Sequence, residues 1–480
     1  MNKIDKIRKN KVSKDILQGG IRKTLLRLAF PTMIAFAFHM GFNFVDRFFV
    51  SKLGPLAFGA LGMAFIVQSI IIALGTGVGI GAASLIARLI GQKKLEDANR
   101  AALHAMLVVI VISLVFTASG LLGGRAFFKL LGASDEMLPY ILEYVNIIFI
   151  ASGFIFFTMT VNSIFRGEGN MITPMVGMII GVLVNFILDP LFIFGLGPFP
   201  ALGIEGAALA TLIGRMVSAV VLGAALFKGK NLIKPNIKLF RFKKYFIGRI
   251  FDVGGPTIVS RLCNSIGISM IFILLKIFGD NAKAAFTIGI TYQMVAFLPI
   301  IGIGQATVIM VGQNYGAKNY ERVKRIVSKA VLMTFLMVSI ISLVYTIGRE
   351  PFTRLFSQSD DTLYSLSSIF YNHALNYTTL FSNIDNFLFI EIGKNLLQIL
   401  SLSFPFVGMQ YIYVSLLQGQ GKGMESLLLN ICLVIFQLVA AWLISIFAGL
   451  NGIWLGVALG SMLASGVGFL FVRSTNAKLS

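Results

Sequence analysis

Long apolar stretches separated by short polar segments run through the whole chain. Twelve of them are long enough to cross a membrane, because a helix rises 1.5 Å per residue and a hydrocarbon core takes about 20 residues. The pattern therefore predicts an all-α polytopic membrane protein with twelve transmembrane helices. The predicted spans begin near residues 25, 57, 101, 137, 172, 205, 248, 283, 327, 396, 425 and 452.

Composition agrees with this prediction. Hydrophobic residues make up 56% of the 480 and charged residues only 13%, far below the roughly 25% of soluble domains. The net charge of +21 does not indicate a nucleic-acid partner, because Lys and Arg lie in the gaps between apolar runs rather than beside aromatic residues on a soluble surface. The expected partners are the lipid bilayer and small molecules, with no nucleic acid.

The distribution of positive charge predicts the orientation. The basic N-terminal segment, residues 1–24, has no apolar signal core and precedes the first span, so we expect it in the cytoplasm. Most of the remaining Lys and Arg residues lie in alternate gaps, which the same rule places inside. With an even number of spans, the tail at 474–480 is cytoplasmic as well.

The chain contains an internal repeat. Shifted by 225 residues, Pro31, Gly77 and Lys93 fall on Pro256, Gly302 and Lys318 without a gap. Further on, FRGEGN at 165–170 matches LQGQGK at 417–422 at an offset of 252. The second half therefore carries an insertion of 27 residues, within about 350–396, on the outer side. Its aromatic content suggests a surface helix at the outer interface.

Each half holds six spans, so the two halves have the same orientation. We expect two pseudo-symmetric six-helix lobes around a central cleft, an arrangement in which transporters bind substrate between the halves. The predicted segments are an N-lobe at 25–227, a basic cytoplasmic linker at 228–247 and a C-lobe at 248–473.

Motifs of enzymes are absent from the sequence. It has no Walker loop, no HExxH and no GxSxG, and its three histidines are scattered. A membrane-embedded transferase would need a clustered catalytic set, so we expect no enzyme and no cofactor. GTGVGIGAAS at 75–84 lacks the preceding strand of a nucleotide loop, and close helix packing through small residues explains it better.

Polar residues inside the spans carry the candidate chemistry, since lipid penalises them. Their spacings of three or four residues place them on common helix faces. Neither carboxylate has a counterpart in the second half, where the equivalent positions are Ile271 and Ala441. The candidates are His39, Asn43 and Asp46 on the first span, Asn185 and Asp189 on the fifth, and Thr211 and Arg215 on the sixth.

Two interpretations of the carboxylates stay open. Asp46 and Asp189 form interhelical salt bridges, or they repel one another in a poorly hydrated lobe and serve as a reversible site for a proton or a cation. Arg215 neutralises Asp189, or it lines an aqueous cleft together with Arg261 of the seventh span. Gln437 occupies the position that corresponds to Asn185 in the second half.

The chain resembles the multidrug and toxic compound extrusion (MATE) family, within the multidrug/oligosaccharidyl-lipid/polysaccharide exporter superfamily. The resemblance covers essentially the whole sequence and is greatest to the DinF-like branch. It rests on FPTM and FNFVDRFFVSKLG, on GVGIGAASLIARLIGQKK, and on NSIFRGEGN, NFILDPLFIFGLG and GIEGAALAT, in this order.

The resemblance implies a monomeric secondary antiporter of the cell membrane, which exports organic compounds in exchange for H⁺ or Na⁺ by alternating access. The basic Arg215 and Arg261 depart from the family pattern and extend the expected substrates from cations to anions and zwitterions. The alternative is a flippase for lipids or lipid-linked precursors. The residues implied are Asp46, Asn185, Asp189 and Thr211 for the coupling ion, which includes Na⁺ but no structural metal; Pro31 as a hinge; His39, Asn43, Asn162, Met178 and Arg215 in the N-lobe cavity; and Arg261 and Gln437 in the C-lobe.

Overall fold

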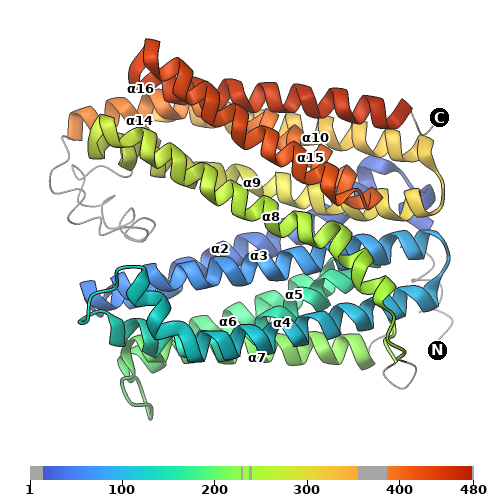
Figure 1. Cartoon of the computed structure of the whole chain (residues 1–480), viewed down its shortest axis with the longest axis horizontal. Coiled ribbons are helices and arrows are strands. Elements are labelled where there is room, and N and C mark those ends of the chain that lie inside the picture. Colours follow the sequence, from blue (N-terminus) through green and yellow to red (C-terminus); the bar gives the residue numbers. More distant parts are fainter. Residues whose placement is uncertain (1–13, 229–230, 237–239, 355–385, 478–480) are drawn as a thin grey trace. The chain divides into compact units, whose positions relative to one another are not determined.

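A computed structural model describes residues 14–228, 231–236, 240–354 and 386–477 (Figure 1). These residues form helices joined by short turns, and no strand occurs among them, which confirms the all-α prediction. Most of the predicted insertion, with its suggested surface helix, lies outside the described residues.

The chain divides into two compact units. Unit 1 contains residues 34–254, and its core is a layer of long helices in which α5 packs against α3, α4 and α7, and α6 packs against α7 (Figure 1). Its helices are the second half of α2 (Ile21–Ser51), α3 (Pro55–Gly91), α4 (Leu95–Leu130), α5 (Leu138–Gly167), α6 (Ile172–Phe194), α7 (Gly203–Lys228) and the first third of α8 (Lys244–Leu275).

Unit 2 contains the described residues from 255 onward together with residues 15–33. Within it α9 packs against α10, α14 and α15, and α15 packs against α16. Its helices are the first half of α2, the rest of α8, α9 (Gly279–Gly316), α10 (Tyr320–Ile347), α11 (Arg349–Arg354), α14 (Asn386–Ser401), α15 (Phe404–Gln420) and α16 (Gly423–Ala477), with the short 3₁₀ turn η2 (Lys276–Phe278) between α8 and α9.

The described residues contain the twelve predicted spans. Helices α8 and α9 are two spans joined at η2, and α16 is two spans joined at Gly449, whose φ of 56° ends the first of them. The tenth span is the pair α14 and α15, bent by 43°. It begins at Asn386, ten residues before the predicted start, because the sequence NFLFIEIGK includes charged residues that lower its hydropathy.

The repeat seen in the sequence is also present in the backbone. Lys93 and Lys318, 225 residues apart, are the two non-glycine residues with positive φ in the described chain, at 60° and 59°. Each follows the helix that ends at Gly91 or Gly316. A left-handed residue there is costly for any side chain except in a tight turn, so both halves use the same turn between their second and third spans.

Small residues bring helices together at equivalent places in the two units. A Cβ on Gly254 of α8 would lie 2.9 Å from the carbonyl oxygen of Gly77 in α3, within unit 1. A Cβ on Gly302 of α9 would lie 3.0 Å from the carbonyl oxygen of Ala29 in α2, within unit 2. Unit 1 therefore includes the first segment of α8, which is the first helix of the second repeat. Unit 2 includes the first segment of α2, which is the first helix of the first repeat.

The glycine-rich stretch of α3 packs as the sequence predicted. A Cβ on Gly75 or Gly79 would meet side-chain atoms of Met159 or Ser163 on α5 at 2.5 Å. Close approach of backbones through small residues is the usual packing of membrane helices. The stretch is a helix interface and not a nucleotide loop.

The linker before α8 is fastened to unit 1. The Glu168 carboxylate accepts from the Ile233 N–H at 2.9 Å, and the Asn99 side-chain oxygen accepts from the Lys234 N–H at 2.6 Å. These contacts satisfy backbone donors of a segment that has no helix of its own.

Candidate functional site

Polar residues of α6 and α7 meet inside unit 1. The Asn185 amide nitrogen donates to Asp189 Oδ1 at 2.9 Å and reaches Thr211 Oγ1 at 3.4 Å. The helices approach closely here because glycines face each other: a Cβ on Gly214 would lie 2.7 Å from the carbonyl oxygen of Gly181. The glycine pair thus places the hydroxyl of α7 beside the amide of α6.

A second chain of contacts leads to Asp46 on α2. The Tyr144 hydroxyl on α5 donates to Asp46 Oδ2 at 3.4 Å, and the Gln68 amide on α3 donates to the Tyr144 oxygen at 3.1 Å. Both Asp46 and Tyr144 are buried. Three helices therefore position one carboxylate.

Charge interactions join these groups into one cluster. Asp46 acts electrostatically on Asp189 and also on Arg215. Arg215 in turn acts on Tyr144 and His39. The sequence predicts that Arg215 neutralises Asp189 or lines an aqueous cleft, whereas the carboxylate whose charge acts on it is that of Asp46. We name His39, Asp46, Tyr144, Asn185, Asp189, Thr211 and Arg215 the N-lobe cluster.

Two oxygens of the N-lobe cluster lack a donor. Asp189 Oδ2 and Asn185 Oδ1 accept no hydrogen bond from the residues that the structure describes. Asp189 is 0% exposed and Asn185 1%. A buried polar atom without a partner costs about 1–3 kcal/mol, and more when it is charged. A proton or a hard cation, which oxygen ligands favour, would remove this cost.

The remaining predicted N-lobe residues, and His39 of the cluster, differ in burial. His39 and Met178 are half-buried, and Asn162 is buried on α5, with its side-chain oxygen unbonded among the described residues. Pro31 is buried within α2. The side chain of Asn43 lies outside the part of the chain that the structure describes.

The two predicted C-lobe residues belong to unit 2, whereas the cluster belongs to unit 1. Arg261 is exposed on α8, in unit 2. Gln437 donates to Ser461 Oγ at 2.9 Å, which links the two spans of α16. No group of three His, Cys, Asp or Glu side chains suited to a metal occurs among the described residues.

Sequence reasoning missed Tyr144 and Gln68. Each is a polar residue within an apolar span, which was the signal used for Asp46 and Asn185. Tyr144 and Asp46 are 98 positions apart in the sequence and lie on different helices, so no spacing within one helix reveals their contact.

Comparisons with known proteins extend over nearly the whole chain. The sequence model of the MatE family matches residues 31–191 and 256–443, which include Asp46, Asn185 and Asp189 but not Thr211. The chain is 27% identical over 450 residues to a protein of Shewanella oneidensis named FAD transporter, a match that covers 93% of each.

Two further proteins also match the chain. The probable multidrug resistance protein NorM of Thermotoga maritima is 27% identical over 359 residues, 73% of this chain and 75% of that one. A solved outward-facing multidrug resistance MATE transporter of the MOP superfamily superposes with a TM-score of 0.86 at 28% identity, over 97% of this chain and 98% of its own.

Proposed function

This chain belongs to the MatE family of membrane transporters, and from that premise we propose that it is a secondary antiporter. It exports organic compounds in exchange for H⁺ or Na⁺ by alternating access. The coupling ion occupies a site formed by Asp46, Asn185, Asp189 and Thr211. We place the chain in the DinF-like branch, in which the acidic residues lie in the N-terminal lobe.

The arrangement of Asn185 carries this proposal. Its amide nitrogen donates to Asp189 and reaches Thr211, while its own oxygen and the second oxygen of Asp189 are buried and accept no hydrogen bond from the described residues. The nearby charge of Asp46 adds to the negative potential there. A single positive ion removes both the repulsion and the unsatisfied acceptors.

Helix α2 can transmit the binding of the coupling ion. Its first half belongs to unit 2 and its second half, which carries Asp46, belongs to unit 1. Pro31 lies just before this change, and a proline within a helix removes one backbone hydrogen bond and favours a bend. Ion arrival at Asp46 shifts the second half of α2, and Pro31 is the hinge about which it turns.

The available energy is sufficient. One charge that crosses a potential of 100 mV yields about 2.3 kcal/mol, which supports a gradient of roughly fiftyfold. No cofactor is required for this exchange.

For the substrate, we propose an anionic or zwitterionic compound of the size of a flavin nucleotide. The half-buried Arg215 places a positive charge in the N-lobe cluster, and the Shewanella relative is named for a flavin dinucleotide. We propose that Arg215, His39, Asn162 and Met178 line the part of the N-lobe that receives it, and we assign Arg261 and Gln437 to the cleft side of the C-lobe.

We further propose a monomer in the cell membrane with both termini in the cytoplasm. The excess of Lys and Arg in the N-terminal segment and in alternate loops supports this orientation. The excess of Lys and Arg sets orientation when the loops are short, as they are between these spans.

Transport in proteoliposomes tests the function. The purified chain is reconstituted, gradients of H⁺ and Na⁺ are imposed in turn, and uptake of FAD and of a cationic dye is followed. Asp46→Asn should abolish coupled transport and leave the thermal unfolding temperature within a few degrees. Asp135→Asn, which alters an acid paired with Lys129 outside the cluster, is the matched control.

Equal coupled transport by Asp46→Asn and the unaltered chain would rule out the assigned role. Movement of lipid between leaflets without use of either gradient would favour the flippase alternative, in which the arginines bind a diphosphate.

A further inference from the structure

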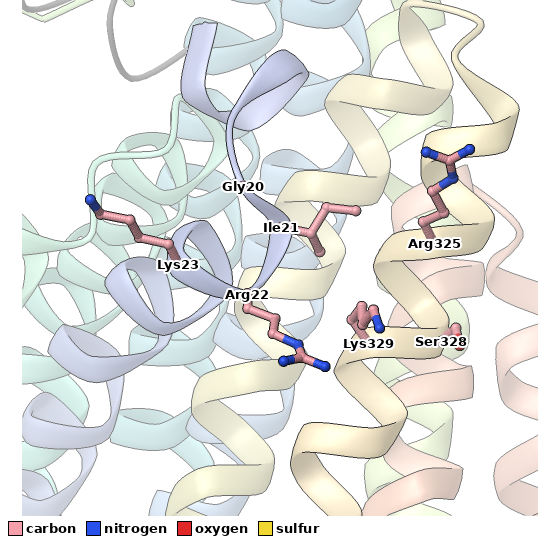
Figure 2. A pocket seen from close by; sticks show the side chains of 7 residues that line it. All are labelled: Gly20, Ile21, Arg22, Lys23, Arg325, Ser328 and Lys329. Atoms are coloured by element: carbon pink, nitrogen blue, oxygen red, sulfur yellow. The ribbon is translucent and has the colours of Figure 1, made fainter.

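A cavity with basic residues in its lining lies in unit 2, whereas the N-lobe cluster belongs to unit 1 (Figure 2). It has a volume of about 590 Å³, within the roughly 300–1,000 Å³ of small-molecule sites. Four of its lining residues are basic, and none of the lining residues that the structure describes is acidic. The cavity is lined by Gly20, Ile21, Arg22, Lys23, Arg325, Ser328 and Lys329.

The nearby acids are engaged elsewhere. Asp15 pairs with Arg27 at 2.7 Å, and Glu321 pairs with Lys324 at 2.9 Å. Among the described residues, no carboxylate pairs with any of the four basic side chains of the cavity. Arg22 and Lys329, the two basic side chains that extend toward each other, repel, and an anion bound between them would remove that repulsion.

The wall formed by the start of α2 is held in place. The Arg322 guanidinium on α10 donates to the carbonyl oxygens of Ile16 and Gly19, and the Asn314 amide on α9 donates to that of Ile16. Ile16 is fully buried. Because this anchor precedes α2, the first backbone N–H groups of α2 are fixed at the cavity, where a helix favours negative charge.

Beyond the cavity, both helices continue with exposed apolar side chains. On α2, Arg22 is followed at intervals of four by Leu26 and Phe30, both exposed. On α10, Arg325 and Lys329 are followed on the same face by a further exposed row. This row consists of Leu332, Leu336 and Ile340.

We propose that this cavity binds the phosphate of an anionic phospholipid, with the acyl chains along the exposed faces of α2 and α10. In Figure 2 the side chain of Arg22 extends toward α10, whereas that of Lys23 extends away from it. Arg22 and Lys329 therefore hold the phosphate, whereas the guanidinium of Arg325, one turn before Lys329 on α10, extends away from Arg22. The bound lipid fastens the first half of α2 to α10 within unit 2.

Native mass spectrometry of the purified full-length chain tests the site. The chain, in a neutral detergent, is titrated with phosphatidylglycerol, with phosphatidylcholine and with inorganic phosphate. Phosphatidylglycerol should bind more tightly than phosphatidylcholine. Each basic residue near an anionic lipid contributes about 1 kcal/mol, so the double variant Arg22→Gln, Lys329→Gln should weaken binding of phosphatidylglycerol about 25-fold.

The double variant Lys93→Gln, Lys94→Gln is the matched control. It removes two charges from an exposed turn of unit 1 and should leave the affinity unchanged. Competition by inorganic phosphate at equal concentration would show a site for free phosphate and overturn the lipid assignment. Equal weakening by both double variants, or equal binding of the two lipids, would overturn the site itself. Circular dichroism verifies that each variant is folded.

Discussion

At the scale of single residues, the Tyr144 hydroxyl is a hydrogen-bond donor to Asp46, the residue that we propose binds the coupling ion. It donates to Asp46 while it accepts from Gln68, so the carboxylate shares its charge with a fixed donor. A donor of this kind to a charged group is worth about 1.5–3 kcal/mol when the geometry is good. In the mechanism that we propose, the coupling ion competes with this donor for Asp46.

Tyr144→Phe should therefore tighten binding of the coupling ion. With the donor removed, Asp46 interacts more strongly with H⁺ or Na⁺, and the half-saturating ion concentration for transport should fall about tenfold, since the contact of 3.4 Å is a long one. Proteoliposome transport at graded ion concentrations measures it. Tyr140→Phe, on an exposed side chain one turn earlier in α5, should leave the half-saturating concentration unchanged. An equal change in the half-saturating ion concentration in both variants would show that the hydrogen bond between Tyr144 and Asp46 does not affect ion binding.

His104 on α4 is a second residue whose role the sequence did not reveal. Its Nε2 accepts from the Lys243 N–H at 2.8 Å and its Nδ1 lies 2.7 Å from the Arg100 carbonyl oxygen, so Nδ1 carries the hydrogen and donates. The ring packs against Phe240 and Phe246. This histidine is a structural anchor for the linker.

His104→Leu should loosen the linker. The substitution keeps the apolar volume but leaves the Lys243 N–H without its acceptor, at a cost of about 1–3 kcal/mol. Trypsin should then cut at the basic residues of 228–247 about tenfold faster, as followed by mass spectrometry of the fragments. Gln92→Ala, at an exposed position in the turn before α4, serves as the control. An unchanged rate of cleavage in His104→Leu would contradict the anchor.

At the scale of elements, the two spans of α16 form a hairpin in which glycines face the backbone of the preceding span. Gly452, Gly456 and Gly460 recur every fourth residue on one face, and a Cβ on Gly460 would lie 2.5 Å from the backbone nitrogen of Gln437. Gly449 provides the turn, with a φ that other residues rarely adopt. Small residues at this spacing let helices approach closely in lipid.

Gly460→Ala and Gly466→Ala should change stability in opposite directions. At Gly460 the added methyl meets backbone, and overpacking of this kind costs about 1–3 kcal/mol. At Gly466 it enters open space, and the gain in helix propensity of up to about 1 kcal/mol remains. Thermal unfolding in detergent should show a lower midpoint for the first variant and an equal or higher one for the second. A rise for both would mean that the two spans are not in contact.

At the scale of the whole molecule, the sequence predicts the number of spans and the repeat but not which segments pack together. Hydropathy located twelve spans because each must satisfy its own backbone in lipid, and the spacing of Asn185 and Asp189 correctly predicted a shared face. The exchange of the first segments of α2 and α8 depends on contacts such as that between Gly77 and Gly254, which are long-range and leave no periodic signal.

Pro31→Ala should slow transport without destabilising the fold. The substitution restores a backbone donor within α2, which favours a straight helix by up to about 3 kcal/mol. Unfolding temperature should stay equal or rise, while the transport rate in proteoliposomes should fall at least tenfold. Pro139→Ala, in the first turn of α5, where a proline costs little, should leave both unchanged. An unchanged transport rate in Pro31→Ala would show that Pro31 is not the hinge of α2.

The long-range anchoring of the N-terminal segment also constrains synthesis. The carbonyl of Ile16 is bound by Asn314, a residue 298 positions later in the chain. At about 5–20 residues per second, the ribosome makes this partner roughly 15–60 s after the segment that needs it. During that interval the nascent chain must keep Ile16 from other partners, so the start of α2 reaches its final place only after most of the protein has been translated.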